Sequence, residues 1–194
     1  MISRVSEKAA EYFAQIGTIP HEDKDLYSYG FFLLFSYLFF FMLTVLYGFL
    51  FRIPFESMLF YMMFIAIRSY AGGFHASKES TCTISTSIAL FVSVFIIRYL
   101  TVLKLIIFPF ILSVICQILI VMYAPLDSEA RRLTSKEKKK YREKSFFIGV
   151  VIICIGAFFI QIRYSIFCTC VVSLALESFL LVLSKIRRYR ASGK

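Results

Sequence analysis

The sequence lacks the short motifs that identify two common classes of hydrolase. It contains neither H-E-x-x-H, which holds zinc on a helix in metalloproteases, nor G-x-S-x-G, which carries the nucleophile of serine hydrolases. It also lacks an even number of cysteines: there are five, and four of them lie in apolar stretches. The sequence therefore disfavours zincin chemistry, serine-hydrolase chemistry and the disulfide framework of a secreted protein.

Long polar stretches are scarce as well, because 59% of the 194 residues are hydrophobic and 23 are phenylalanine. The mean hydropathy is +0.77, and a water-soluble domain of this length could not bury so much apolar surface. The net charge of +10 is spread over short stretches between apolar runs, which is typical of membrane orientation and not of nucleic-acid binding. We predict an all-α integral membrane protein with one membrane domain over residues 1–194, surrounded by the lipid bilayer.

Six apolar segments follow an N-terminal region, residues 1–30, whose first half places apolar and charged residues on opposite helix faces. We expect this region to form an interfacial amphipathic helix and a loop, and residues 185–194 to form a basic cytoplasmic tail. Residues 31–184 are predicted to form a bundle of six transmembrane helices. Their expected bounds are 31–51, 54–70, 83–97, 105–124, 145–162 and 165–184.

The distribution of positive charge predicts how these helices are oriented. If both termini are cytoplasmic, the cytoplasmic side carries 18 of the 22 Lys and Arg residues and the outer side carries the other four. Cytoplasmic connections of membrane proteins are enriched in Lys and Arg, and an even number of spans places both termini on one side. The sequence therefore predicts an N-in, C-in topology.

The connection between the second and third segments holds the strongest candidates for catalysis. His75 and Cys82 lie there, and His75 is one of only two histidines in the chain. A thiol protease needs a thiolate nucleophile and an imidazole that activates it and later protonates the leaving amine. On one unbroken helix the two side chains would lie about 10 Å apart along the axis, so the chain must bend between them. Ser80 is a suitable N-cap for the next helix, which would place Cys82 in a first turn where the helix dipole favours a thiolate.

Other polar residues in or near the apolar segments have less specific roles. Spacing alone does not separate His75 and Cys82 from a surface histidine and a cysteine that only packs. Glu177, inside the sixth segment, is costly in a bilayer unless it faces the bundle, so it has either a functional or a helix-pairing role. Cys168 and Cys170 would point about 200° apart on a helix and are not expected to share a metal. We predict no metal site and no cofactor.

The fourth connection, residues 125–144, is strongly basic. Positive residues in such a place anchor the topology against anionic lipid, and they can also attract an acidic peptide substrate. The two roles are compatible. The candidates for substrate binding are Arg131, Arg132, Lys136, Lys138, Lys139 and Lys140.

Two patterns in the chain resemble one known family. The first is Arg68-x4-Gly73-x-His75-x6-Cys82, preceded by a short apolar segment, which is similar to the signature of the accessory gene regulator B (AgrB) family. Members of that family are membrane cysteine endopeptidases of Gram-positive quorum sensing. With the six apolar segments and the length near 190 residues, the resemblance covers nearly the whole chain.

The second pattern is Tyr123-Ala-Pro125-Leu-Asp127, which leads into the basic connection and resembles another hallmark of the family. Family members often have Asn-Lys/Arg-Pro shortly after the Ala-Pro pair, whereas this sequence has Ala130-Arg131-Arg132. The departure puts the conformation of the basic connection in question and leaves the His/Cys element unchanged.

The resemblance implies a fold, a substrate and a mechanism. The chain would be a single membrane peptidase domain in the cell membrane of a Gram-positive bacterium, with its active site at the cytoplasmic face. Its substrate would be an AgrD-like propeptide with an acidic C-terminal tail. Cys82, activated by His75, would cleave before that tail through an acyl-enzyme thioester, which the peptide's own Cys or Ser would close to a thiolactone or lactone. Arg68, Gly72 and Gly73 would support the site.

Two other classes of function stay open on the sequence. A small transporter or exporter of a peptide, without covalent catalysis, would use Glu177, Lys104 and Gln161 along a path through the bundle. A non-catalytic membrane partner of a signalling complex is the second class. An enzyme needs both His75 and Cys82, while a transporter should tolerate their loss. The sequence also leaves open whether the protein forms a homodimer.

Overall fold

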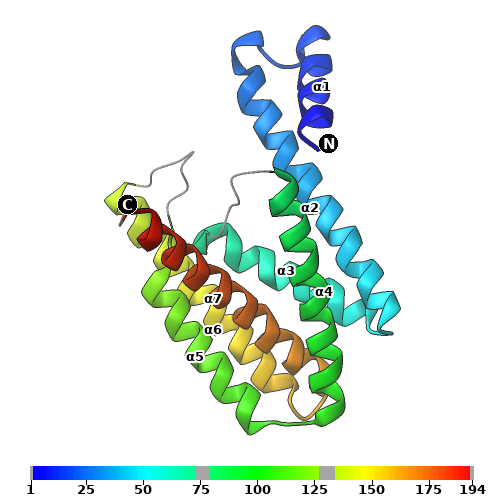
Figure 1. Ribbon diagram of the computed structural model, residues 1–194, viewed down its shortest axis with the longest axis vertical. Helices are drawn as coiled ribbons and strands as arrows, with labels where there is room; N and C mark the ends of the chain where they lie inside the picture. Colours follow the sequence, from blue (N-terminus) through cyan, green and yellow to red (C-terminus); the bar gives the residue numbers. More distant parts are fainter. Residues whose placement is uncertain (1, 73–78, 127–133, 193–194) are drawn as a thin grey trace. The chain divides into compact units, whose positions relative to one another are not determined.

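The computed structural model describes residues 2–72, 79–126 and 134–192, and all elements in these ranges are helical (Figure 1). The all-α prediction is thereby confirmed for these residues. The element bounds are α1 Ile2–Gln15, η1 His21–Asp23, α2 Lys24–Leu50, α3 Pro54–Ala71, α4 Glu79–Leu103, α5 Ile107–Tyr123, α6 Ser135–Phe159 and α7 Tyr164–Ser192.

Each of the six predicted membrane segments corresponds to a separate helix, from α2 to α7. Within the described part of the chain, three helical stretches are long and apolar enough to cross a membrane, and α5 is a shorter apolar helix. The three stretches are His21–Leu50, Ser80–Leu103 and Tyr164–Arg187. These apolar helices are those of a membrane protein, whereas the count of six spans and the orientation stay predictions.

The chain divides into two compact units, residues 1–43 and residues 44–194. In the first unit α1 is an amphipathic helix at the predicted place. Its buried residues are the small ones, Ser6, Ala10 and Ala14. Two of its large apolar side chains, Val5 and Tyr12, are exposed. An interfacial helix needs such an uncovered apolar face, although its position at a membrane surface stays a prediction.

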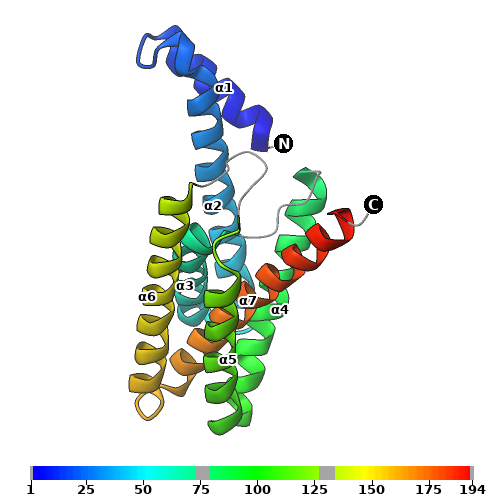
Figure 2. The ribbon, with the colours of Figure 1, turned by 90° about the vertical axis from the view of Figure 1, so that its left-hand side faces the viewer.

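In the second unit α7 is the central helix. It packs against α3, α4, α5 and α6, and Figures 1 and 2 show it running diagonally among them. Every side chain from Ile166 to Leu174 is buried. A helix that is covered on all sides forms the core of its bundle, and α7 has this role here.

Helix α6 begins earlier than the sequence analysis predicted. Its first residue is Ser135, ten residues before the expected start of the fifth membrane segment, so the second half of the basic connection is helical. The reason is a capping box at Thr134. The Thr134 side chain accepts a hydrogen bond from the Glu137 backbone N–H (3.3 Å), and the Glu137 carboxylate accepts one from the Thr134 N–H (2.9 Å). This pairing satisfies two backbone donors that a helix start otherwise leaves unpaired.

A polar clamp joins the start of α3 to the start of α7. The Glu56 carboxylate, which is buried, accepts hydrogen bonds from the Ser165 hydroxyl (2.8 Å) and from the Arg163 guanidinium (3.2 Å). The Arg163 guanidinium also lies over the Phe55 ring, 4.9 Å from its centroid. The buried Glu56 carboxylate is thus paired, at the opposite end of α3 from Arg68 and Gly72.

Candidate active site

Cys82 lies in the first turn of α4, as predicted from the sequence. The helix begins at Glu79, so Ser80 lies inside the first turn and is not its N-cap, which corrects that detail of the prediction. The Cys82 side chain is half-buried, and its carbonyl accepts a hydrogen bond from the Ser85 hydroxyl (3.0 Å). A reagent or substrate could therefore reach this thiol at the start of the helix.

The other four cysteines lie deeper in the helices. Cys116, Cys168 and Cys170 are buried, and Cys154 is exposed in the last two turns of α6. All five cysteines lie in the described residues, and none of them forms a disulfide. In the described part of the chain, no three His, Cys, Asp or Glu side chains are grouped so that they could hold a metal ion.

Four predicted site residues lie outside the described residues, namely Gly73, His75, Arg131 and Arg132. The pairing of His75 with Cys82 therefore stays a prediction. Arg68 and Gly72 are described, in the last turn of α3 and directly after it. Lys136, Lys138, Lys139 and Lys140 are described in the first two turns of α6.

The end of α3 and the end of α5 are in direct contact. The Leu126 N–H donates a hydrogen bond to the Ala71 carbonyl (3.0 Å), and the Gly72 N–H donates one to the Arg68 carbonyl (3.0 Å). Gly72 has φ +76° and ψ −163°, a conformation open essentially to glycine alone. A Cβ at this position would lie 2.6 Å from the Leu126 carbonyl oxygen. The segments that carry the two sequence patterns therefore meet, and Gly72 permits the contact.

The basic start of α6 contacts both of these helix ends. The Arg142 Nε donates a hydrogen bond to the Ala124 carbonyl (3.1 Å) at the end of α5. The Lys144 ammonium lies 4.7 Å from the centroid of the Tyr70 ring in the last turn of α3, and the Tyr70 and Tyr141 rings lie 5.9 Å apart. Neither Arg142 nor Lys144 was a predicted site residue, because nothing in the local sequence distinguishes them from the neighbouring lysines.

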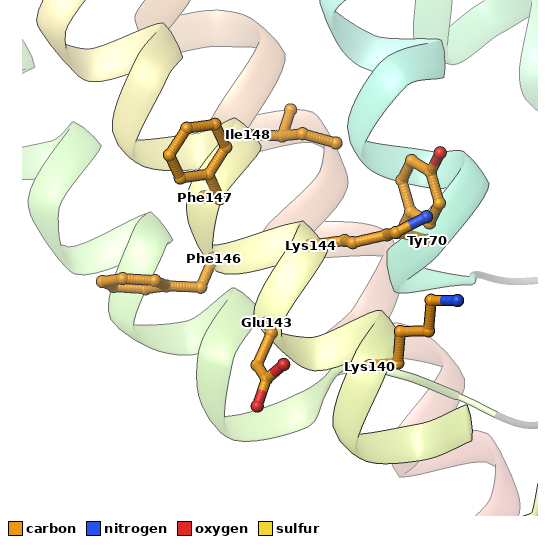
Figure 3. Close-up of a pocket in the computed structure, with 7 residues that line it drawn as sticks. All are labelled: Tyr70, Lys140, Glu143, Lys144, Phe146, Phe147 and Ile148. Carbon is orange, nitrogen blue, oxygen red and sulfur yellow. The ribbon is translucent and has the colours of Figure 1, made fainter. Parts of the chain in front are cut away.

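An open pocket of about 610 Å³ lies between α3 and α6 (Figure 3). In Figure 3 the Lys144 side chain extends toward Tyr70, and Lys140 lies one turn nearer the start of α6, while Glu143 points away from Tyr70. The pocket therefore offers two cations beside an aromatic ring. Its lining residues are Tyr70, Lys140, Glu143, Lys144, Phe146, Phe147 and Ile148.

Arg68 forms an ion pair across the bundle. Its Nη1 lies 3.7 Å from the Glu177 carboxylate of α7, and its guanidinium lies 5.5 Å from the centroid of the Phe64 ring. Glu177 is completely buried. The pair joins the last turn of α3 to the central helix. Glu177, for which the sequence predicted a role in function or in helix pairing, therefore has a defined partner.

The residues named for a transporter path are dispersed in the structure. Glu177 is buried against Arg68, whereas Lys104 and Gln161 are exposed, in the connections that follow α4 and α6. A substrate path would need these polar groups to line one channel. Their described positions give no support to such a path.

Comparison with known proteins gives a family for the chain. The profile of one family, described as accessory gene regulator B, matches residues 6–181. Two curated relatives come from Clostridium perfringens, an AgrB-like protein of strain SM101 and AgrB-like protein 2 of strain 13. Each is 25% identical over 149 residues, which cover 74% of this chain and 70% of the relative. No solved structure matches the chain.

Proposed function

Because the chain belongs to the accessory gene regulator B family, we propose that it is a membrane cysteine endopeptidase that cleaves and cyclises an AgrD-like propeptide. Family membership gives it a role in the processing of an accessory gene regulator quorum-sensing peptide. The observation that carries the finer proposal is the half-buried thiol of Cys82 in the first turn of α4, seven residues after His75 in the chain. The deciding test is the replacement of this thiol by Ala or Ser, which should abolish cleavage of the propeptide.

The proposed reaction has two acyl-transfer steps. The Cys82 thiolate attacks the carbonyl carbon of the peptide bond before the acidic tail, and the imidazolium of His75 gives its proton to the leaving amine. The tail departs and leaves the peptide as a thioester on Cys82. A Cys or Ser of the same peptide then attacks that thioester, His75 accepts its proton, and Cys82 is released as the thiolate. The ring closes as a thiolactone or lactone, and no water is consumed.

The proposed membrane arrangement is one domain over residues 1–194 with six spans and both termini in the cytoplasm. The support for it is the distribution of Lys and Arg, and in this arrangement the ends of α3 and α5 and the start of α6 would lie on the cytoplasmic side. The acidic propeptide would then meet the protein in the compartment where it is made. A thiol on that side stays reduced and able to react.

Labelling of single cysteines should test this orientation. Lys139 is exposed on α6, and Gln161 is exposed between α6 and α7 without the ion pair that Arg163 makes. In a cysteine-free background, a membrane-impermeant maleimide should label Cys at position 161 in intact cells and should label Cys at position 139 only after the cells are broken. Labelling of position 139 in intact cells would show that the orientation is the opposite of the proposed one and that the site does not face the cytoplasm.

The pocket between α3 and α6 is the proposed place where the acidic tail of the propeptide binds. Lys140 and Lys144 present positive charge beside Tyr70, and this charge lies next to the contact between α3 and α5. Lys138 and Lys139 add to the field around it, and opposite charges attract over about a Debye length, roughly 8 Å at physiological salt. The bilayer would be a second partner of the same basic surface.

Neutralising three lysines should separate substrate attraction from topology. Replacing Lys138, Lys139 and Lys140 by Gln should raise the KM for the propeptide about tenfold and leave kcat nearly unchanged, because the lysines attract substrate and do not react. Added salt should weaken cleavage by the wild type more than cleavage by the variant.

The matched control removes three positive charges elsewhere, by changing Arg52, Arg98 and Lys104 to Gln. This control keeps the net charge of the lysine variant and should keep the wild-type KM and salt dependence. If cleavage by the wild type and by the lysine variant depends equally on salt, and both insert normally, the basic segment anchors the topology and does not attract the substrate.

A further inference from the structure

We propose that a pocket between the end of α5 and the last turns of α7 binds the phosphate headgroup of an anionic phospholipid. The pocket has a volume of about 210 Å³ and shares no lining residue with the pocket between α3 and α6. Its lining residues are Tyr123, Val182, Lys185, Ile186 and Tyr189. The proposed reaction uses none of them, so the inference is independent of the proposed function.

Four of the lining residues lie on one face of α7. Val182, Lys185, Ile186 and Tyr189 occupy positions i, i+3, i+4 and i+7, which share one side of a helix. The stretch Tyr164–Arg187 is long and apolar enough to cross a membrane, and Lys185 lies in its last turn. Along this face an apolar side chain within the stretch is therefore followed by a cation and then by an aromatic ring. This order is typical of a helix that passes from the membrane interior into the headgroup region.

The end of α5 forms the other wall of the pocket and orients the cation. Tyr123 is the last residue of α5, and the Lys185 ammonium lies 4.2 Å from the centroid of its ring. A cation–π contact attracts the ammonium to the ring face, and the N–H donors that point away from the ring remain able to bind an anion. A side chain that is already held in place loses less conformational entropy when a ligand binds. The pocket thus offers a positioned cation.

Within the residues that the structure describes, no acidic side chain forms an ion pair with Lys185. Residues 105–126 and 178–194 contain no Asp or Glu, whereas five Lys and Arg residues lie between positions 185 and 194. The pocket between α3 and α6 differs in this respect, because Glu143 lines it. A cation that no carboxylate neutralises, in a segment of positive charge, favours an anion as the ligand.

A phospholipid matches both the charge and the apolar part of the pocket. The exposed fractions of Ile186 and Tyr189 are 49% and 82%. A soluble phosphate ion would pair with Lys185 and leave these two side chains uncovered. A lipid would place its phosphate at the ammonium and the start of its acyl chains against Val182 and Ile186, toward the membrane interior. The ligand must carry a net negative charge, as phosphatidylglycerol does and phosphatidylcholine does not.

The test uses the absence of tryptophan from the chain. Tyr189→Trp, at an exposed position that lines the pocket, gives the full-length protein one tryptophan and keeps an aromatic ring there. The protein is reconstituted in phosphatidylcholine bilayers with increasing fractions of phosphatidylglycerol that is brominated on its acyl chains near the headgroup. Quenching of the tryptophan fluorescence then reports the lipid beside position 189. We expect phosphatidylglycerol to bind there about tenfold more tightly than brominated phosphatidylcholine, because its net negative charge is paired with the ammonium.

Adding Lys185→Gln should remove nearly all of this preference, whereas Lys185→Arg should keep it, because a guanidinium also pairs with phosphate and stacks on an aromatic ring. Lys139→Gln is the matched control. It removes one positive charge from an exposed position at the start of α6, outside the pocket, and should leave the preference unchanged. Equal losses in Lys185→Gln and Lys139→Gln would mean that overall charge alone attracts the anionic lipid, and would overturn the inference.

Two further arms identify the ligand and control for folding. Glycerol phosphate in excess should not reverse the quenching; if it does, the pocket takes a soluble phosphate and the assignment to a lipid is wrong. Equal quenching by brominated phosphatidylcholine would also refute the assignment. Lys185→Met is a second neutral variant, of similar length, for the case in which Lys185→Gln does not fold. An unchanged preference in either folded neutral variant would show that Lys185 does not bind the headgroup.

Discussion

Cleavage of the propeptide is expected to fall to background when Cys82 is replaced by Ala or Ser, while the protein still inserts in the membrane. The reason is chemical: without the thiolate no acyl-enzyme forms, and a serine hydroxyl is a poor nucleophile beside a base suited to a thiol. Replacing His75 by Ala should slow cleavage by about 10²–10⁴-fold, the usual contribution of a general acid and base. Cleavage by membrane vesicles, followed as release of the acidic tail, measures both effects.

The control for Cys82 is the set of the other four cysteines. Changing Cys116, Cys154, Cys168 and Cys170 together to Ala should leave substantial cleavage, with some loss of stability because three of the four are buried. An inactive but well-folded quadruple variant together with an active Cys82→Ala protein would place the nucleophile elsewhere and refute the proposed mechanism.

The second large effect is expected at Gly72. Gly72→Ala forces a Cβ into a conformation that only glycine adopts readily, at a cost on the order of 1–3 kcal/mol. The added carbon would also lie 2.6 Å from the Leu126 carbonyl oxygen, a backbone atom that cannot rotate away. The ends of α3 and α5 must then separate, and a displacement of about 1 Å near a reacting centre can slow catalysis about a hundredfold. Both the thermal midpoint and the cleavage rate should decrease.

Gly17→Ala separates strain from steric contact. Gly17 also has a positive φ, +72°, but a Cβ there meets no atom within 4 Å. This variant should lose about 1 kcal/mol of stability from the left-handed backbone alone and keep its cleavage rate. If Gly72→Ala cleaves as fast as Gly17→Ala does, the contact between α3 and α5 has no part in the reaction.

The parts of the fold that the sequence predicted are those with a local signal. Apolar runs marked all six helices from α2 to α7, and the spacing of apolar residues marked α1. The early start of α6 was also readable, since Thr134 and Glu137 form a capping-box pattern, but the high density of charge was interpreted as a connection. The predicted start of α6 was therefore wrong because the density of charge was given more weight than the capping-box pattern.

The contacts around the candidate site had no local signal. Arg68 and Glu177 are separated by more than one hundred residues, and nothing in either neighbourhood names the other. The hydrogen bond from Leu126 to Ala71 depends on how α3 and α5 pack, as does the position of Lys144 over Tyr70. Sequence patterns identified the segments, whereas the tertiary packing determined which of their residues meet.

The central position of α7 has a consequence for the order of biosynthesis. Four helices pack against α7, yet α7 follows all of them in the chain, so the ribosome makes the core of the bundle after its surroundings. Until then the ion pair between Arg68 and Glu177 cannot form, so the last turn of α3 lacks that attachment to the rest of the bundle. The nascent protein therefore carries an incomplete bundle until translation reaches residues 164–192. Membrane chaperones and quality-control proteases would encounter it in that state.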